Sequence, residues 1–171
     1  AQAFADTLAP LGISVRYSQI AGLRTAEAIL SCFEYAGLDF PCLEDLQSLV
    51  VEKQRRVRDL IRISLDPLPI MDAFLNWAKP RYEMALVTSG SRATVSLALK
   101  KLGYLSLFKP MIFADDVKLG KPSPEGLRLA LQAYNCQPEH ALVFEDSEAG
   151  FKAAVSANIR YINIIDYTFF K

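Results

Sequence analysis

Three loops in the second half of the chain carry side chains that could do chemistry together. Each loop follows a short apolar run of the kind that forms a buried strand. The loops bring hydroxyls, an ammonium group and two adjacent carboxylates, which belong to Thr88, Ser89, Lys121, Glu145 and Asp146. Ligands bind outside the carboxyl ends of the strands in open parallel sheets, so we expect the three loops to meet at one edge. Together these hydroxyl, ammonium and carboxylate groups could bind a phosphate group next to a divalent cation.

The first two loops could hold the phosphate. Thr88, Ser89 and Gly90 precede a predicted helix, where unpaired backbone N–H groups and the helix dipole favour an anion. Lys121 is held by the following Pro122 and can neutralise a phosphate oxygen or an acidic neighbour. The predicted phosphate-binding residues are therefore Thr88, Ser89, Gly90 and Lys121.

The third loop could hold the cation. Glu145 and Asp146 are adjacent carboxylates, which repel and raise each other's pKa unless a cation lies between them. Oxygen ligands of this kind suit Mg²⁺, so we predict a magnesium site here. Taken alone, a hydroxyl loop could be a helix cap and a Glu-Asp pair a solvated turn. All three loops in order, each at a strand end, are hard to obtain by chance.

The elements that must position these loops alternate regularly from residue 66 onward. Short apolar runs that predict strands alternate with stretches that have helical periodicity. The predicted strands are 84–87, 111–113, 141–144 and 161–164, and the predicted helices are 70–78, 92–102, 124–134 and 149–157. This alternation is typical of βαβ units, so the predicted fold class is α/β with a parallel sheet.

The first part of the chain has a different character. Residues 1–65 are almost entirely helical in pattern, and the prolines at 67 and 69 break that pattern. We therefore predict a helical domain over 1–65 and an α/β domain over 66–171. A predicted helix at 43–63 carries one face of interleaved charges, which we interpret as a solvated face rather than an anion site. That face bears Glu52, Lys53, Arg55, Arg56, Arg58 and Asp59.

Composition excludes several classes of protein. Nineteen Lys and Arg residues balance nineteen Asp and Glu residues, so there is no basic excess to favour a nucleic-acid partner. No apolar run approaches the roughly 18–20 residues that a membrane-spanning helix needs. The first ten residues carry no secretory signal pattern. The three cysteines are few and odd in number, which favours reduced thiols and a cytoplasmic location.

The loops resemble motifs of the haloacid-dehalogenase-like hydrolase superfamily. More narrowly, they look like those of its small helical-cap phosphatases and β-phosphoglucomutase-like members. The matching segments are Ala-Leu-Val-Thr-Ser-Gly-Ser at 85–91, Gly-Lys-Pro-Ser-Pro at 120–124 and Val-Phe-Glu-Asp-Ser-Glu-Ala-Gly at 143–150. Gly-Leu-Arg-Thr at 22–25 resembles the loop by which the family's cap selects substrates. The resemblance implies a Rossmann-like parallel sheet with a helical cap inserted near its start.

The resemblance also assigns roles to individual residues. It implies that Thr88 and Lys121 are catalytic, with Thr88 binding the phosphate and Lys121 stabilising its charge. It implies that Glu145 and Asp146 hold Mg²⁺. Arg24 is implied to reach from the cap toward the substrate and to contribute to specificity.

One departure from the family pattern affects the expected activity. The family's first motif, Asp-x-Asp-Gly-Thr, is absent, and no Asp-x-Asp occurs anywhere in the 171 residues. In the family its first Asp is the nucleophile and its second is the general acid and base. The family order places this motif and its central strand before Ala1. We therefore expect the 171 residues alone to lack a central strand and to be inactive.

The function implied by the resemblance is Mg²⁺-dependent phosphoryl transfer through an aspartyl-phosphate. The expected substrate is a small phosphorylated metabolite, specifically a sugar phosphate. Two alternatives remain open, a β-phosphoglucomutase-like isomerase and a non-catalytic phosphate-binding pseudoenzyme. A dehalogenase of the same superfamily needs no metal, so the carboxylate pair argues against it. A receiver domain shares the acidic residues and the lysine, but the helical segment does not fit it.

Overall fold

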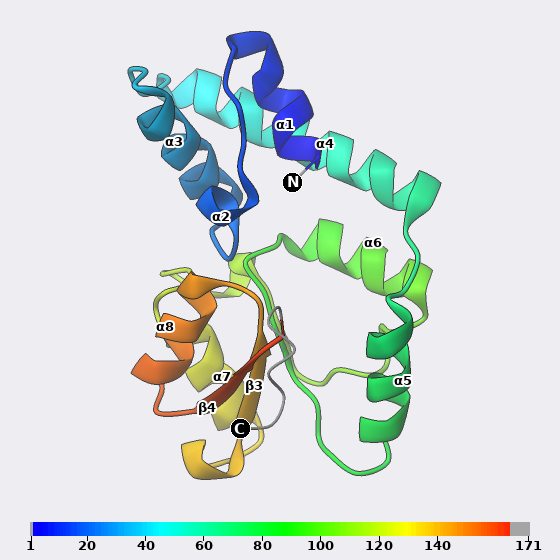
Figure 1. The fold of residues 1–171 in the computed structure, drawn as a ribbon. Helices are drawn as coiled ribbons and strands as arrows, with labels where there is room; N and C mark the ends of the chain where they lie inside the picture. The colour runs from blue at the N-terminus through cyan, green and yellow to red at the C-terminus, as the bar shows by residue number, and fades with distance from the viewer. Residues whose placement is uncertain (1, 165–171) are drawn as a thin grey trace.

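The computed structural model describes residues 2–164, which form two layers (Figure 1). We call residues 2–64 the helical layer and residues 69–164 the α/β layer. The main helices of the helical layer are α1 (Gln2–Leu8), α3 (Thr25–Ala36) and α4 (Leu43–Ser64). They lie above the α/β layer in the view of Figure 1. None of the helices within 2–164 is long and apolar enough to cross a bilayer.

The helical layer has its own apolar core. It forms because apolar residues recur on one face of each helix and bury that face against the neighbouring helices. The chain turns at Gly12 (φ 73°) after η1 and at Gly37 (φ 66°) after α3, both left-handed positions that favour glycine. Two short elements in between, η1 (Ala9–Leu11) and α2 (Tyr17–Ile20), were not predicted. The buried core residues are Phe4, Leu8, Ile13, Ile20, Ala28, Ile29, Cys32 and Phe33.

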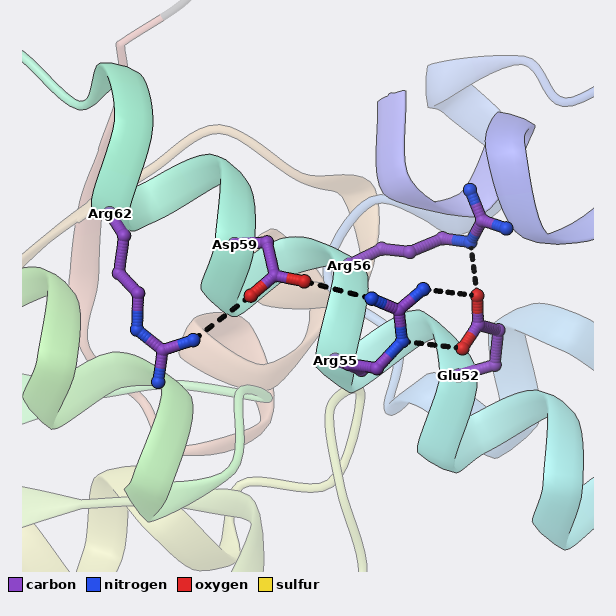
Figure 2. A network of polar contacts seen from close by, with 5 residues as sticks. All are labelled: Glu52, Arg55, Arg56, Asp59 and Arg62. Atoms are coloured by element: carbon purple, nitrogen blue, oxygen red, sulfur yellow. Dashed lines mark hydrogen bonds and ion pairs between the residues drawn. The ribbon is translucent and has the colours of Figure 1, made fainter.

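Charged residues of α4 form a network of ion pairs (Figure 2), and their side chains are 35–61% exposed, which agrees with the predicted solvated face. Glu52 accepts hydrogen bonds from Arg55 and Arg56, while Asp59 pairs with Arg55 and Arg62. The hydrogen bond from Arg55 is the main reason that the pKa of Glu52 falls to about 2. Exposed pairs of this kind contribute little to stability, so we assign this network no function. Lys53 is the exception on this helix and belongs to the site described below.

The α/β layer contains four strands, all in parallel pairs. Strand β1 (Leu86–Val87) pairs with β2 (Met111–Ile112), and β3 (Leu142–Glu145) pairs with β4 (Arg160–Asn163). Each strand lies within two or three residues of its predicted range, and the predicted parallel pairing is confirmed. Within residues 2–164 the pairs remain separate two-stranded sheets, with no ladder between β1 and β3.

Four helices accompany these strands. They are α5 (Pro69–Ala78), α6 (Arg92–Leu102), α7 (Glu125–Ala133) and α8 (Glu148–Ser156), each close to its predicted range. Helix α7 packs against β1 and β2, and α8 packs against β3 and β4. A second apolar cluster is buried between α7 and the segment that begins with α8. Its residues are Leu127, Ala153, Ala154, Ala157 and Ile159.

A lysine joins the two layers at the far end of α4. Helix α4 contacts α6, and Lys101 of α6 donates hydrogen bonds to the carbonyls of Ile61 and Arg62, each at 2.7 Å. These carbonyls lie in the last turn of α4, where a helix has unpaired acceptors and favours a cation. The contact fixes α4 above the carboxyl edge of the strands.

Candidate active site

The three predicted loops meet in one cavity of about 350 Å³ between the two layers. The strands bring them together, because β1 ends next to Thr88 and β3 ends at Glu145, on the same edge of the parallel pairs. Residues of the helical layer close the cavity from the other side. The residues that the sequence assigned to phosphate and metal all line it: Thr88, Ser89, Gly90, Lys121, Glu145 and Asp146.

A buried ion pair lies at the base of this cavity. The Lys121 ammonium is 2.6 Å from Oε2 of Glu145, and their side chains are only 13% and 8% exposed. The second oxygen of Glu145 accepts a hydrogen bond from the Ser147 hydroxyl at 2.6 Å. Ser147 in turn accepts from the Gly150 N–H at 3.1 Å and so caps α8. A Cβ at Gly150 would overlap the Glu145 carboxyl group, so a glycine is needed for this close approach.

The hydroxyl loop lines the same cavity as this ion pair. The Thr88 N–H donates to the Ile112 carbonyl at 2.9 Å, which extends the β1–β2 ladder by one residue. The Thr88 hydroxyl accepts a hydrogen bond from the Gly90 N–H at 3.0 Å. The Ser89 hydroxyl donates to the Gly22 carbonyl of the helical layer at 2.5 Å. The loop therefore presents hydroxyls to the cavity just before α6 begins.

Asp146 contacts the helical layer through Tyr17. The Tyr17 hydroxyl donates to Oδ2 of Asp146 at 2.7 Å. This hydrogen bond is the main reason that the pKa of Tyr17 rises to about 12, and burial adds to the effect. The sequence analysis did not identify Tyr17, because 129 residues separate it from its partner.

The carboxylates differ in their suitability for Mg²⁺. Both oxygens of Glu145 are bonded within the protein, to Lys121 and Ser147. Asp146 is partly exposed to the cavity, so its carboxylate is the better placed of the two for a metal. Among the residues described, no group of three His, Cys, Asp or Glu side chains could hold a metal ion. Mg²⁺ commonly uses one or two carboxylates together with water and substrate phosphate, which a site at Asp146 fits.

Lys53 lies in the cavity wall, and the prediction that it belongs to the solvated face of α4 is wrong. Its ammonium is 3.4 Å from the Thr25 hydroxyl and 4.4 Å from the centroid of the Phe4 ring. Burial lowers the pKa of this lysine. Lys53 follows Leu49 by four residues and precedes Val57 by four, so it falls on the apolar stripe of the helix. That spacing was the signal that could have identified it.

Arg24 lies outside the 350 Å³ cavity. Its guanidinium donates to the carbonyls of Ala114, Val117 and Lys118 at 3.1, 2.5 and 3.0 Å. The structure therefore does not place this side chain where the sequence expected it to meet a substrate. The residues of the helical layer that face the cavity are instead Gly22, Leu23, Thr25, Lys53 and Gln54.

A parallel α/β layer with a lysine–carboxylate pair and a hydroxyl loop under a helical layer is the arrangement that the motif resemblance led us to expect. The model of the haloacid dehalogenase-like hydrolase family matches residues 16–164. The chain therefore belongs to this family, and the resemblance inferred from its motifs is confirmed.

Two curated relatives are phosphatases of phosphorylated sugars by name. Fructose-1-phosphate phosphatase YqaB of Escherichia coli strain K12 is 33% identical over 120 residues, covering 70% of this chain and 63% of the relative. A phosphorylated carbohydrates phosphatase of Thermotoga maritima is 37% identical over 121 residues, covering 70% of this chain and 55% of the relative. The chain thus spans less than two thirds of the length of either relative.

The fold is also that of solved structures in the family. A β-phosphoglucomutase from Clostridium difficile superposes with a TM-score of 0.83, covering 95% of this chain and 75% of the other. The two sequences are 22% identical, so this likeness concerns the fold alone. The α/β class that the sequence predicted is confirmed.

Proposed function

We propose that this chain forms the larger part of a Mg²⁺-dependent phosphatase that acts on a small phosphorylated sugar. The observation that carries the proposal is the convergence of the three loops, with the Lys121–Glu145 pair between them, on one cavity. The names of the two curated relatives support a phosphorylated sugar as the substrate class. A cavity of about 350 Å³ lies within the range of about 300–1,000 Å³ typical of small-molecule sites. The small and odd number of cysteines supports a cytoplasmic location.

The core residues would act on the phosphoryl group itself. The Thr88 hydroxyl and the N–H groups of the following loop bind phosphate oxygens. Lys121 stabilises the negative charge that develops on these oxygens in the transition state. Glu145 holds the lysine in place and compensates its charge in the buried site. Mg²⁺, held by Asp146, would supply additional neutralisation of the phosphate charge.

The helical layer would act as the cap of the enzyme, with the domain boundary near residue 65. Lys53, Gln54 and Thr25 face the core loops across the cavity, where they can bind the sugar part of the substrate. Burial lowers the pKa of Lys53, and an anionic or hydroxylated ligand would give its ammonium a further polar partner beside the Thr25 hydroxyl. Closing this layer over the core would keep bulk water away from the phosphate.

A further strand, carrying the nucleophilic carboxylate, would lie between β1 and β3. Among the described residues the two strand pairs remain separate, and Val87 of β1 and Phe144 of β3 both line the cavity. On β3, Leu142 and Phe144 are 46% and 38% exposed, although strands of parallel sheets are normally covered. We propose that this strand comes from outside the 171 residues and brings the Asp-x-Asp motif. Residues 1–171 alone would then lack the attacking group and be inactive.

The test compares the intact gene product with residues 1–171 alone. We expect the intact product to release inorganic phosphate from sugar phosphates with Mg²⁺, to lose this activity with EDTA, and residues 1–171 alone to release none. Lys121→Ala should remove most of the activity, because a lost electrostatic contact in such a site costs about 3–4 kcal/mol. Lys100→Ala, an exposed lysine of α6, is the matched control.

Three outcomes would contradict parts of this proposal. EDTA-sensitive turnover by residues 1–171 would show that the attacking group lies within them. Conversion of a sugar phosphate to its isomer without phosphate release would identify a mutase. Phosphate binding without turnover by the intact product would identify a pseudoenzyme.

A further inference from the structure

Arg24 is bound to the loop that leads to Lys121. It stands at the start of α3, and its side chain leaves the helical layer and enters the α/β layer. Two of its guanidinium nitrogens donate to three carbonyls within residues 114–118. One planar fork thus binds three acceptors of the same short segment, a geometry that suits arginine and that a lysine could not reproduce.

The same segment is also held by Glu125. The Glu125 carboxylate accepts hydrogen bonds from the N–H groups of Lys118 and Leu119, both at 2.9 Å. The Leu119 N–H is the main reason that the pKa of Glu125 is lowered, followed by that of Lys118. The carbonyls of the segment are therefore bonded to Arg24 and its N–H groups to Glu125. This arrangement fixes the backbone just before Lys121.

Gly120 shows how closely Arg24 approaches the lysine. A Cβ at Gly120 would lie 2.9 Å from Nε of Arg24 and 3.1 Å from its Cδ and Cγ atoms. The backbone of Gly120 does not have the positive φ that favours glycine, so the close approach is what excludes a side chain here. The Nε atom of Arg24 is itself buried and has no hydrogen-bond partner. The arginine therefore packs directly on the residue that precedes Lys121.

From these contacts we infer that Arg24 is a positioning residue for Lys121. Through Arg24 the position of the helical layer determines the position of the Lys121 loop. The role of Arg24 in the reaction rests on the function proposed above. The inference replaces the expectation that Arg24 binds the substrate, because its guanidinium is bonded to the protein backbone and lies outside the cavity. A positioning role and a specificity role differ in what they do to kcat and KM.

The test uses the intact gene product with Arg24→Met, Arg24→Lys, Gly120→Ala and the double variant Arg24→Met/Gly120→Ala. Arg62→Met is the matched control, since this exposed arginine of the helical layer contacts only Asp59 among the ion pairs described. The first readout is amide hydrogen exchange, which does not depend on activity. We expect Arg24→Met to speed exchange about tenfold within 114–121 and to leave α8 unchanged.

The double variant separates this mechanism from a general loss of stability. Gly120→Ala should also speed exchange in this segment, because its methyl group pushes Arg24 away. In the Arg24→Met variant the flexible Met side chain replaces the guanidinium next to residue 120. Adding Gly120→Ala to this variant should therefore change the exchange rate little further. Arg24→Lys should behave like Arg24→Met. If Arg24→Met does not fold, Gly120→Ala and Arg24→Lys carry the same test.

Kinetics provide the second readout. Arg24→Met should lower kcat by about tenfold to a hundredfold for a sugar phosphate and for p-nitrophenyl phosphate alike, because both present the same group to Lys121. A rise in KM for the sugar phosphate alone would overturn the inference and support substrate binding. Unchanged exchange within 114–121, or fully additive effects of the two substitutions, would overturn it as well. Absence of turnover in the unmodified product would count against the proposed function, while exchange would still decide whether Arg24 holds the loop.

Discussion

Replacing Glu145 by Gln should destabilise the protein strongly, although the two side chains have almost the same size. Glu145 and Lys121 are 8% and 13% exposed and 2.6 Å apart, so little water can reach the position of the lost carboxylate. The amide oxygen of Gln can still accept the Ser147 hydrogen bond. Its NH₂ group then faces the ammonium of Lys121, and two donors oppose each other.

The magnitude follows from the burial of the pair. Removing one partner of a buried ion pair costs about 3–5 kcal/mol, because the other charge is left buried and uncompensated. No cavity is created, so the whole effect is electrostatic. Against a typical total of about 5–15 kcal/mol, this loss is a large part of the free energy of unfolding. Urea unfolding of the intact product at neutral pH, followed by circular dichroism, measures the change.

A second substitution tests the electrostatic explanation. In Glu145→Gln/Lys121→Met the uncompensated charge is gone, so the double variant should regain about 1–3 kcal/mol relative to Glu145→Gln alone. Neither variant should keep activity, since both disturb Lys121. A loss below about 1 kcal/mol for Glu145→Gln, or purely additive effects in the double variant, would refute the reasoning by showing that the pair is solvated.

Three further predictions concern residues around this pair. Lys53→Met should raise KM for a sugar phosphate and leave kcat for p-nitrophenyl phosphate nearly unchanged, since the lysine faces the part of the cavity opposite the phosphate loops; equal effects on both substrates would exclude this role. Glu125→Gln should lower stability at neutral pH, and the difference from the unmodified protein should shrink below about pH 4.5. The sign follows because a carboxyl with a lowered pKa stabilises the fold above its unfolded pKa and loses this effect as it is protonated; a pH-independent difference would contradict it. Gly150→Ala should destabilise the protein by about 1–3 kcal/mol in thermal unfolding, although alanine normally favours a helix, because the methyl group overlaps Glu145; a stabilised variant would show that the carboxyl moves aside.

Much of the fold could be predicted because local signals and the tertiary structure agree. The helix at Arg92–Leu102 has its predicted bounds, since a run of helical periodicity ends at Gly103, which adopts a φ of 76°. Asn158 adopts a φ of 58° at the end of α8, as expected of the residue type that best replaces glycine in a left-handed position. The three loops meet as the expected topology predicts, in which parallel strands end at the same edge, although the described strands form two separate pairs.

Prediction was incomplete at three residues of the site region, and the reason differs for each. Tyr17 finds its partner 129 residues away, and no periodicity reports such a contact. Arg24 bonds to backbone carbonyls, which every residue carries, so its partners leave no mark in the sequence. Lys53 was assigned by its charge, although its phase on α4 places it among the apolar residues.

The segment 17–24, which contains α2 and the turn before α3, touches all three loops of the site, but the contacts differ in kind. A phosphate oxygen would compete with Gly22 for the Ser89 hydroxyl, and a cation would compete with the Tyr17 hydroxyl for Asp146. The bonds of Arg24 end on carbonyls outside the cavity, so neither ligand competes for them. Substrate and metal can therefore displace the first two contacts while the third keeps the lysine loop in place. A site that must admit a substrate and still hold Lys121 needs this division between exchangeable and permanent contacts.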